Sequence, residues 1–356
     1  MKKFFILAAA AIVALAACTK NEVQKTSNRQ IAYNAVTAKS VTSRAIINST
    51  YYAPTDPAFG VWGLYQATDW STNHSSSVWV GTNASTSAQI SYSSSQWKNA
   101  ANTDYWPLSG SIVFMGYSPY ANVSSKAAIS VADNKATLTV SNFQSSTGSY
   151  VDDLMWSDAV EKSANDTNYD ADGNGTTTYN GVPIVFHHAL SQIIVKAKAA
   201  EDYAAQGYTL TITGITLTID DNATLTVQDN LTADPVVSWT EPATDAEPII
   251  LADGSTALTT SFVQQGNPIL VIPQTLTAGA DVLHVTYKLT KNTIDSPTTK
   301  DISLTAGSEV TLSSLQANKK YILNLIVSLD EILYSPDVID WEATVESTYD
   351  VPEDAD

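Results

Sequence analysis

The sequence predicts an all-β protein made of antiparallel β-sandwiches, and three observations support this class. Apolar and polar residues alternate over many short segments rich in Val, Ile, Thr and Tyr, and Gly, Pro, Asn and Asp separate these segments. Long segments with helical periodicity are nearly absent, and 44% of the 356 residues are hydrophobic, which is enough for substantial cores. Short, regularly spaced strands are typical of β-sandwiches. The clearest strands are expected at residues 111–117, 136–140, 192–199, 209–219, 269–272, 282–289 and 320–329.

The N-terminus has the organisation of a lipoprotein signal peptide. Lys2 and Lys3 precede an unbroken apolar run of 14 residues, 4–17, which is too short to span a bilayer. The run ends in small residues and then Cys18, the only cysteine of the chain, so no intramolecular disulfide is expected. We therefore expect residues 1–18 to be removed and Cys18 to carry lipid, including an acyl chain such as palmitate. The alternative is an ordinary secretory signal with a chance cysteine.

Charge is distributed unevenly along the chain. The net charge of −18 makes nucleic acid and anionic lipid poor partners. Residues 1–44 nevertheless hold seven basic residues against one acidic residue, and both arginines of the protein, Arg29 and Arg44, lie there. One interpretation is a compositional drift toward lysine. The other is that an arginine-specific protease cuts only the leader, residues 19–44.

The composition of the body indicates two domains. Residues 165–181 are rich in Asp, Asn, Gly and Thr and predict a loop. Six of the eight tryptophans precede this loop, and the strands after it are mainly aliphatic and Thr-rich. We expect one β-sandwich at residues 45–178 and a second at residues 179–337.

The end of the chain, residues 338–356, predicts an unusually long amphipathic strand. Apolar and polar residues alternate over 13 residues, 339–351, or about 43 Å at about 3.3 Å per residue, whereas a typical strand has about 5–6 residues. This strand could bend and pair within its own domain throughout. Alternatively, it is a donor strand that completes the sheet of another molecule. The residues of its apolar face would then be Ile339, Trp341, Ala343, Val345, Tyr349 and Val351.

The leader contains a counterpart to this tail. Ile31, Tyr33 and Ala35 alternate with Ala32, Asn34 and Val36, and this pattern predicts a short strand. If this strand occupies a sheet edge and is cut off after Arg44, it leaves an open groove that a donated strand can fill.

Other chemistry receives little support from the sequence. Asp170, Asp172 and Asn174 have the spacing of the first half of a calcium loop, but Gly181 stands where the bidentate acid is needed, so a solvated acidic turn is favoured. His187 and His188 are adjacent and would point to opposite faces of a strand, which favours core or boundary positions over a shared metal. No nucleophile elbow or phosphate-binding glycine loop is present. We expect no cofactor and no enzymatic activity.

Seven short motifs are spread along the chain. They lie at residues 59–65 (FGVWGLY), 105–107 (YWP), 112–119 (IVFMGYSP), 153–156 (DLMW), 185–190 (VFHHAL), 272–274 (IPQ) and 338–341 (VIDW). No single motif is diagnostic, but in order and spacing they resemble the fimbrillin family, the lipoprotein pilins of type V pili in Gram-negative anaerobes.

The resemblance implies two tandem transthyretin-like β-sandwiches, lipoprotein export and cleavage between Arg44 and Ala45. It also implies polymerisation with other pilin subunits by strand exchange, and a location in a surface fimbrium at the outer membrane. The fibre would adhere to a glycan or protein on a host or bacterial surface. The alternative is a monomeric glycan-binding surface lipoprotein, which would keep its leader and present a cluster of exposed tryptophans.

Overall fold

The protein is all-β, as predicted. The computed structural model describes residues 26–37, 50–51, 55–145, 153–164, 166, 181–240, 246–252, 256–277, 280–305, 312–328 and 331–341. Within these ranges the helical elements are α1 (Trp70–Asn73) and a 3-10 turn (Ala204–Gln206). No helix in this part of the chain is long and apolar enough to cross a membrane. Each of the seven segments expected as strands falls on a strand.

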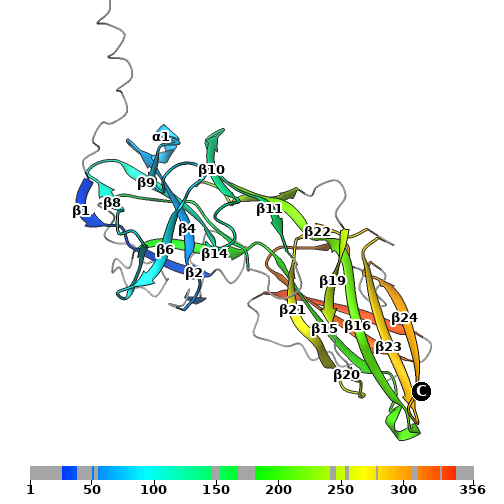
Figure 1. Ribbon diagram of the computed structural model, residues 1–356. Helices are drawn as coiled ribbons and strands as arrows, with labels where there is room; N and C mark the ends of the chain where they lie inside the picture. The colour runs from blue at the N-terminus through cyan, green and yellow to red at the C-terminus, as the bar shows by residue number, and fades with distance from the viewer. Residues whose placement is uncertain are drawn as a thin grey trace, which may run out of the picture.

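A ten-stranded sheet closes on itself in the first half of the molecule. Neighbouring strands pair in one continuous order, and β4 also pairs with β9, so seven of the strands form a closed ring. Figure 1 shows β2, the blue strand of the leader, beside the green β14. In order, the strands are β13 (Val160–Lys162), β9 (Ser111–Ser118), β12 (Met155–Ser157), β14 (Val182–His188), β2 (Tyr33–Thr37), β7 (Gln96–Asn99), β6 (Ala88–Ser93), β4 (Phe59–Gln66) and β5 (Val78–Val80), with β3 (Thr50–Tyr51) attached to β2.

A second sheet covers the outside of this ring. Its order is β10 (Ala127–Ala132), β11 (Lys135–Gln144), β17 (Asn222–Asp229) and β18 (Val236–Thr240). Strand β9 is buried on both faces, because Ile112 and Phe114 point into the ring while Val113 and Met115 point toward the second sheet. This double burial explains why the sequence of β9 is a continuous apolar run.

Two further sheets pack face to face as a β-sandwich with its own hydrophobic core. One sheet contains β21 (Val263–Val271), β15 (Ser191–Ala199), β26 (Lys319–Val327) and β27 (Ile332–Asp340). The other contains β19 (Ala246–Ala252), β16 (Thr209–Asp220), β23 (Val282–Lys291) and β24 (Ile294–Ser303), with β20 (Thr256–Ala257) attached to β16. Buried and half-buried residues alternate strictly along β15, as expected for a strand with one face on a core. Two small pairs complete the fold, β1 (Thr26–Gln30) with β8 (Tyr105–Pro107), and β22 (Gln274–Thr275) with β25 (Ser314–Leu315).

The sheets do not divide where the sequence predicted. The expected boundary lay between residues 178 and 179, but β14 belongs to the ring and the hairpin β17–β18 belongs to the sheet that covers it. The loop predicted at residues 165–181 lies mostly outside the described residues, and composition could not show that β14, which follows it, returns to the first unit. Ala136 of β11 pairs with Asp229 of β17. The sheet that covers the ring is therefore completed by a segment from the second half of the sequence.

Candidate functional site

The leader strand β2 is one of the strands that form the closed ring. The sequence analysis had considered a position at a sheet edge, which the structure does not show. Strand β2 runs parallel to β14, from Tyr33 beside Val182 to Thr37 beside Phe186. On its other side it runs antiparallel to β7, where Tyr33 pairs with Trp97. Taking β2 away would therefore open a slot bounded by two strand edges, whereas loss of an edge strand exposes one.

Side chains of the leader fill the core of the ring. The exposed fractions of Ile31, Tyr33 and Ala35 are 0%, 2% and 1%. Tyr33 makes edge-to-face contacts with Phe59 and Phe114, with ring centroids 6.4 and 5.9 Å apart. The predicted alternation of the leader is therefore confirmed for these residues. The slot has a large, an aromatic and a small position in that order.

Gly181 closes one wall of the slot against the backbone of β2. It has a φ of +109°, and a Cβ atom there would lie 2.6–2.8 Å from backbone atoms of Tyr33. Val182 then donates its backbone N–H to the carbonyl of Ala32 at 2.7 Å. Only glycine combines this backbone conformation with so close an approach.

A buried carboxylate supports the opposite wall. The carbonyl oxygen of Asp104 accepts the backbone N–H of Ile31 at 3.0 Å. Its side chain is buried and accepts a hydrogen bond from Asn99 Nδ2 at 2.8 Å. Burial raises the pKa of the Asp104 carboxyl, and the hydrogen bonds from Asn99 and Thr103 oppose this rise.

The base of the tail is bound to the folded body. Ile339 pairs with Lys320 in the antiparallel ladder of β27 and β26. Trp341 stacks on His188 at the end of β14, with ring centroids 4.4 Å apart and an interplanar angle of 17°. His188 in turn pairs with Asp153, with a shortest N···O distance of 2.9 Å. Residues 338–341 thus belong to the body in this structure, although the sequence analysis assigned them to the tail.

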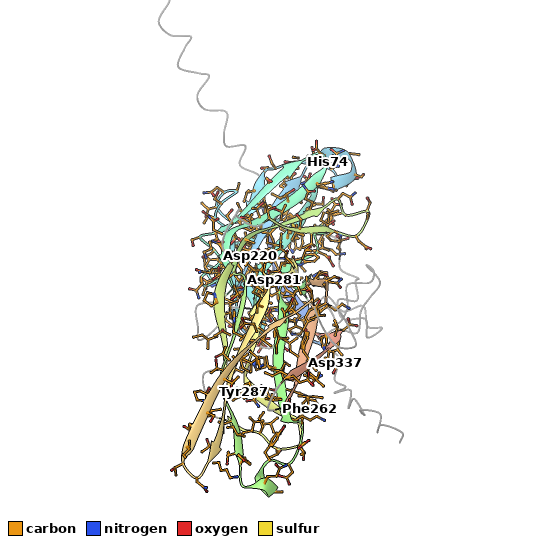
Figure 2. All side chains as sticks on the ribbon, turned by 90° about the vertical axis from the view of Figure 1, so that its right-hand side faces the viewer. His74, Asp220, Phe262, Asp281, Tyr287 and Asp337 are labelled. Carbon is orange, nitrogen blue, oxygen red and sulfur yellow. The ribbon has the colours of Figure 1, made fainter. Side chains whose placement is uncertain are left out.

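Both histidines of the pair are buried, and each contacts a tryptophan and an aspartate. His187 is buried, stacks on Trp156 at 4.4 Å and lies 3.1 Å from Asp158 Oδ2. The described ranges contain no group of three metal-ligating side chains. Asp220 and Asp281 are two neighbouring acids. Figure 2 shows them near each other in the middle of the molecule, far from His74 at one end. Burial raises the pKa of Asp281, and the neighbouring Asp220 raises it further.

The tryptophans do not form an exposed platform. All eight lie in described segments, and five are fully buried: Trp62, Trp70, Trp97, Trp106 and Trp156. Trp79, Trp239 and Trp341 are half-buried. The exposed tryptophan cluster required by the glycan-binding alternative is therefore not formed by these side chains.

The remaining predicted residues lie outside the described ranges and are not placed by the structure. These are Cys18, Arg44, Ala45, Asp170, Asp172, Asn174, Ala343, Val345, Tyr349 and Val351.

Sequence reasoning missed the walls of the slot, above all Gly181 and Asp104. A buried acid in a loop and a glycine with positive φ have no periodic signature, so the alternation that located Ile31 and Tyr33 could not find them.

A closed ring of seven strands that includes β2, covered by a second sheet and followed by a β-sandwich, defines the fold class of the described chain. The chain belongs to the fimbrillin-like family, whose family model matches residues 43–341. A fimbrial protein from Bacteroides vulgatus ATCC 8482 has a similar fold, with a TM-score of 0.60, 17% identity, and coverage of 88% of this chain and 100% of that one. A candidate cell adhesion protein from Bacteroides uniformis ATCC 8492 has a TM-score of 0.50, 17% identity, and coverage of 89% and 100%. No curated protein sequence matches the chain.

Proposed function

We propose that the protein is a structural subunit of a surface fimbrium that supports adhesion. In this proposal it is exported as a lipoprotein through Cys18, reaches the outer membrane, and is cut between Arg44 and Ala45. The released leader takes β2 with it, and the tail of another subunit fills the slot. The subunit acts by assembly and not by catalysis.

One observation carries this proposal. Strand β2, which precedes Arg44 in the sequence, is part of a closed sheet, and its Tyr33 and the adjacent Ile31 are buried in the core of that sheet. Removing it uncovers core side chains and two strand edges, which favours pairing with another chain. Refilling the slot with apolar side chains contributes about 1.5–3 kcal/mol for each large one, before the cost of ordering the strand. Family membership and the fold of the fimbrial protein from Bacteroides vulgatus agree with this role.

The two arginines provide a matched test. The chain from Thr19 onward is treated with an arginine-specific protease, its N-terminus is determined by mass spectrometry, and its size is determined on a native gel. We expect a new N-terminus at Ala45 and a ladder of oligomers. Arg29→Lys should behave in the same way, because Arg44 is still cut and β2 still leaves.

Arg44→Lys is the decisive variant. Cleavage after Arg29 alone leaves β2 attached, so this variant should remain monomeric. If it assembles as well as the wild-type chain, release of β2 is not what drives assembly.

A second arm tests the tail. Truncation after Trp341 leaves β27 and the stack on His188 intact, so the protein should fold and lose its leader yet stay monomeric. Oligomers formed by this truncated chain would show that the tail is not the donor.

A further inference from the structure

The order of side chains in the slot says how a replacement strand lies in it. We infer that the tail of a second copy enters the slot in the direction opposite to β2, with Tyr349 in the place of Tyr33. Val351 then replaces Ile31 and Ser347 replaces Ala35. This inference rests on the proposed function and specifies the direction and register of the donated strand.

Side-chain size is the first argument. The slot holds Ile31, then Tyr33 with its aromatic neighbours, then Ala35, all nearly inaccessible to solvent. Read backwards, the tail offers Val351, Tyr349 and Ser347, which match these three positions as large aliphatic, aromatic and small.

The opposite direction fits poorly at both ends of the slot. With Tyr349 kept at the aromatic position, Ser347 would fall at the place of Ile31 and leave a cavity. Val351 would fall at the place of Ala35 and overfill it. Both cavities and overpacking are destabilising in a close-packed core.

Proline is the second argument. Val36 pairs with Val185 of β14 and with Tyr51 of β3. A tail running in the direction of β2 would put Pro352 at this position, within the ladder, where proline has no N–H to donate. The reversed tail puts Glu346 there, which retains the backbone donor but exchanges the buried Val36 for a charged residue, so one apolar contact is lost at the entrance. Pro352 then lies level with Gln30, outside the ladder of β2 and β14 but at the end of β1, where Gln30 pairs with Tyr105 of β8.

The hydrogen-bond ladders are the third argument. Five residues of β2 pair with β14 in a parallel ladder. Among the described residues, only Tyr33 of β2 pairs with β7. Parallel ladders are slightly less stable per residue than antiparallel ones. Reversing the strand converts the five-residue ladder with β14 to the antiparallel form, and it makes the one-residue contact with β7 and the two-residue contact with β3 parallel. The exchange of leader for tail is thereby favoured over return of the leader.

Engineered disulfides can test the register of the donated strand. The chain from Thr19 onward contains no cysteine, so any disulfide must join the introduced residues. Val185 is half-buried on the face of β14 opposite to Ile184, and it marks the level of Val36. In the reversed register residue 346 comes to this level, and in the other direction residue 352 does. Chains with Val185→Cys are mixed with chains carrying either Glu346→Cys or Pro352→Cys, and all are cut after Arg44 and oxidised.

We expect Glu346→Cys to give at least about tenfold more mixed disulfide than Pro352→Cys, because only a Cα separation of about 4.4–6.8 Å permits the bond. Peptide mass spectrometry identifies the mixed disulfide. Preferential bonding of Pro352→Cys, or oligomers with neither bond, would overturn the direction or register while leaving the proposed assembly intact. Absence of oligomers in every mixture would instead reject the assembly. A chain carrying both Val185→Cys and Glu346→Cys that forms the bond as a monomer would show that the tail fills its own slot, which overturns the second copy as the donor.

Discussion

Strand β2, near the start of the described chain, and strand β27, at its end, are held in opposite ways. Strand β2 is embedded between two neighbours and buries large side chains, but its main ladder is parallel and five residues long. Strand β27 lies at a sheet edge, and nine of its residues pair antiparallel with β26. Its outward side chains Leu333 and Val338 are each 45% exposed. The comparison teaches that the two strands rely on different contacts: β2 mainly on its buried side chains and β27 mainly on its antiparallel backbone ladder.

Breaking the seat of β2 should have the largest effect. Gly181→Ala places a Cβ against the backbone of Tyr33 at a φ of +109°, so we expect a loss of at least about 2–3 kcal/mol in the free energy of unfolding. Urea unfolding of the uncut chain measures this loss. Gly207→Ala is the matched control, because Gly207 also has a positive φ of +79° but nothing lies within 4 Å of its added Cβ. Equal losses in the two variants would mean that the approach to Tyr33 does not matter.

The fixed end of β27 can be tested through its aromatic stack. His188→Ala and Trp341→Ala, made singly and together, should show a coupling of about 0.5–1.5 kcal/mol in unfolding free energy, because stacked aromatic pairs contribute this much beyond burial. Trp156→Ala combined with Trp341→Ala is a control pair, since Trp156 stacks on the other histidine, His187. Additive effects of His188→Ala and Trp341→Ala would show that the base of the tail is not held by this contact.

The smallest effect is expected from the acid beside the leader. Burial raises the pKa of Asp104 in the folded state, so its ionisation opposes folding, and stability falls as pH rises from the ordinary value of 3.8 through the raised one. Asp104→Asn should remove this fall, so its stability relative to the wild-type chain should be greater at about pH 7 than at about pH 3. Urea unfolding at both pH values tests the sign. Asp69→Asn is a contrasting control, because hydrogen bonds from Ser71 and Thr72 lower the pKa of exposed Asp69, which gives the opposite pH dependence.

The sequence allowed the fold class and most strands to be predicted, because period-2 alternation records which face of a strand is buried. Ile31 and Tyr33 were identified as strand residues for this reason. Their position between β14 and β7 could not be predicted, because alternation carries no information about which strands are neighbours. Likewise, Ile339 and Trp341 continue the alternation of the tail, yet contacts with Lys320 and His188 place them in the body. The pattern gives the faces of a strand, and long-range pairing decides where the strand lies.

The hairpin β17–β18 has a consequence for the order in which the protein is made. Because β11 pairs with β17, with Ala136 opposite Asp229, the sheet that covers the ring cannot be completed until nearly two thirds of the chain has been synthesised. Pairings this distant in sequence are slow to form. The strands of the ring all lie at or before His188, so the ring can form first, and the sheet that covers it is completed late in folding.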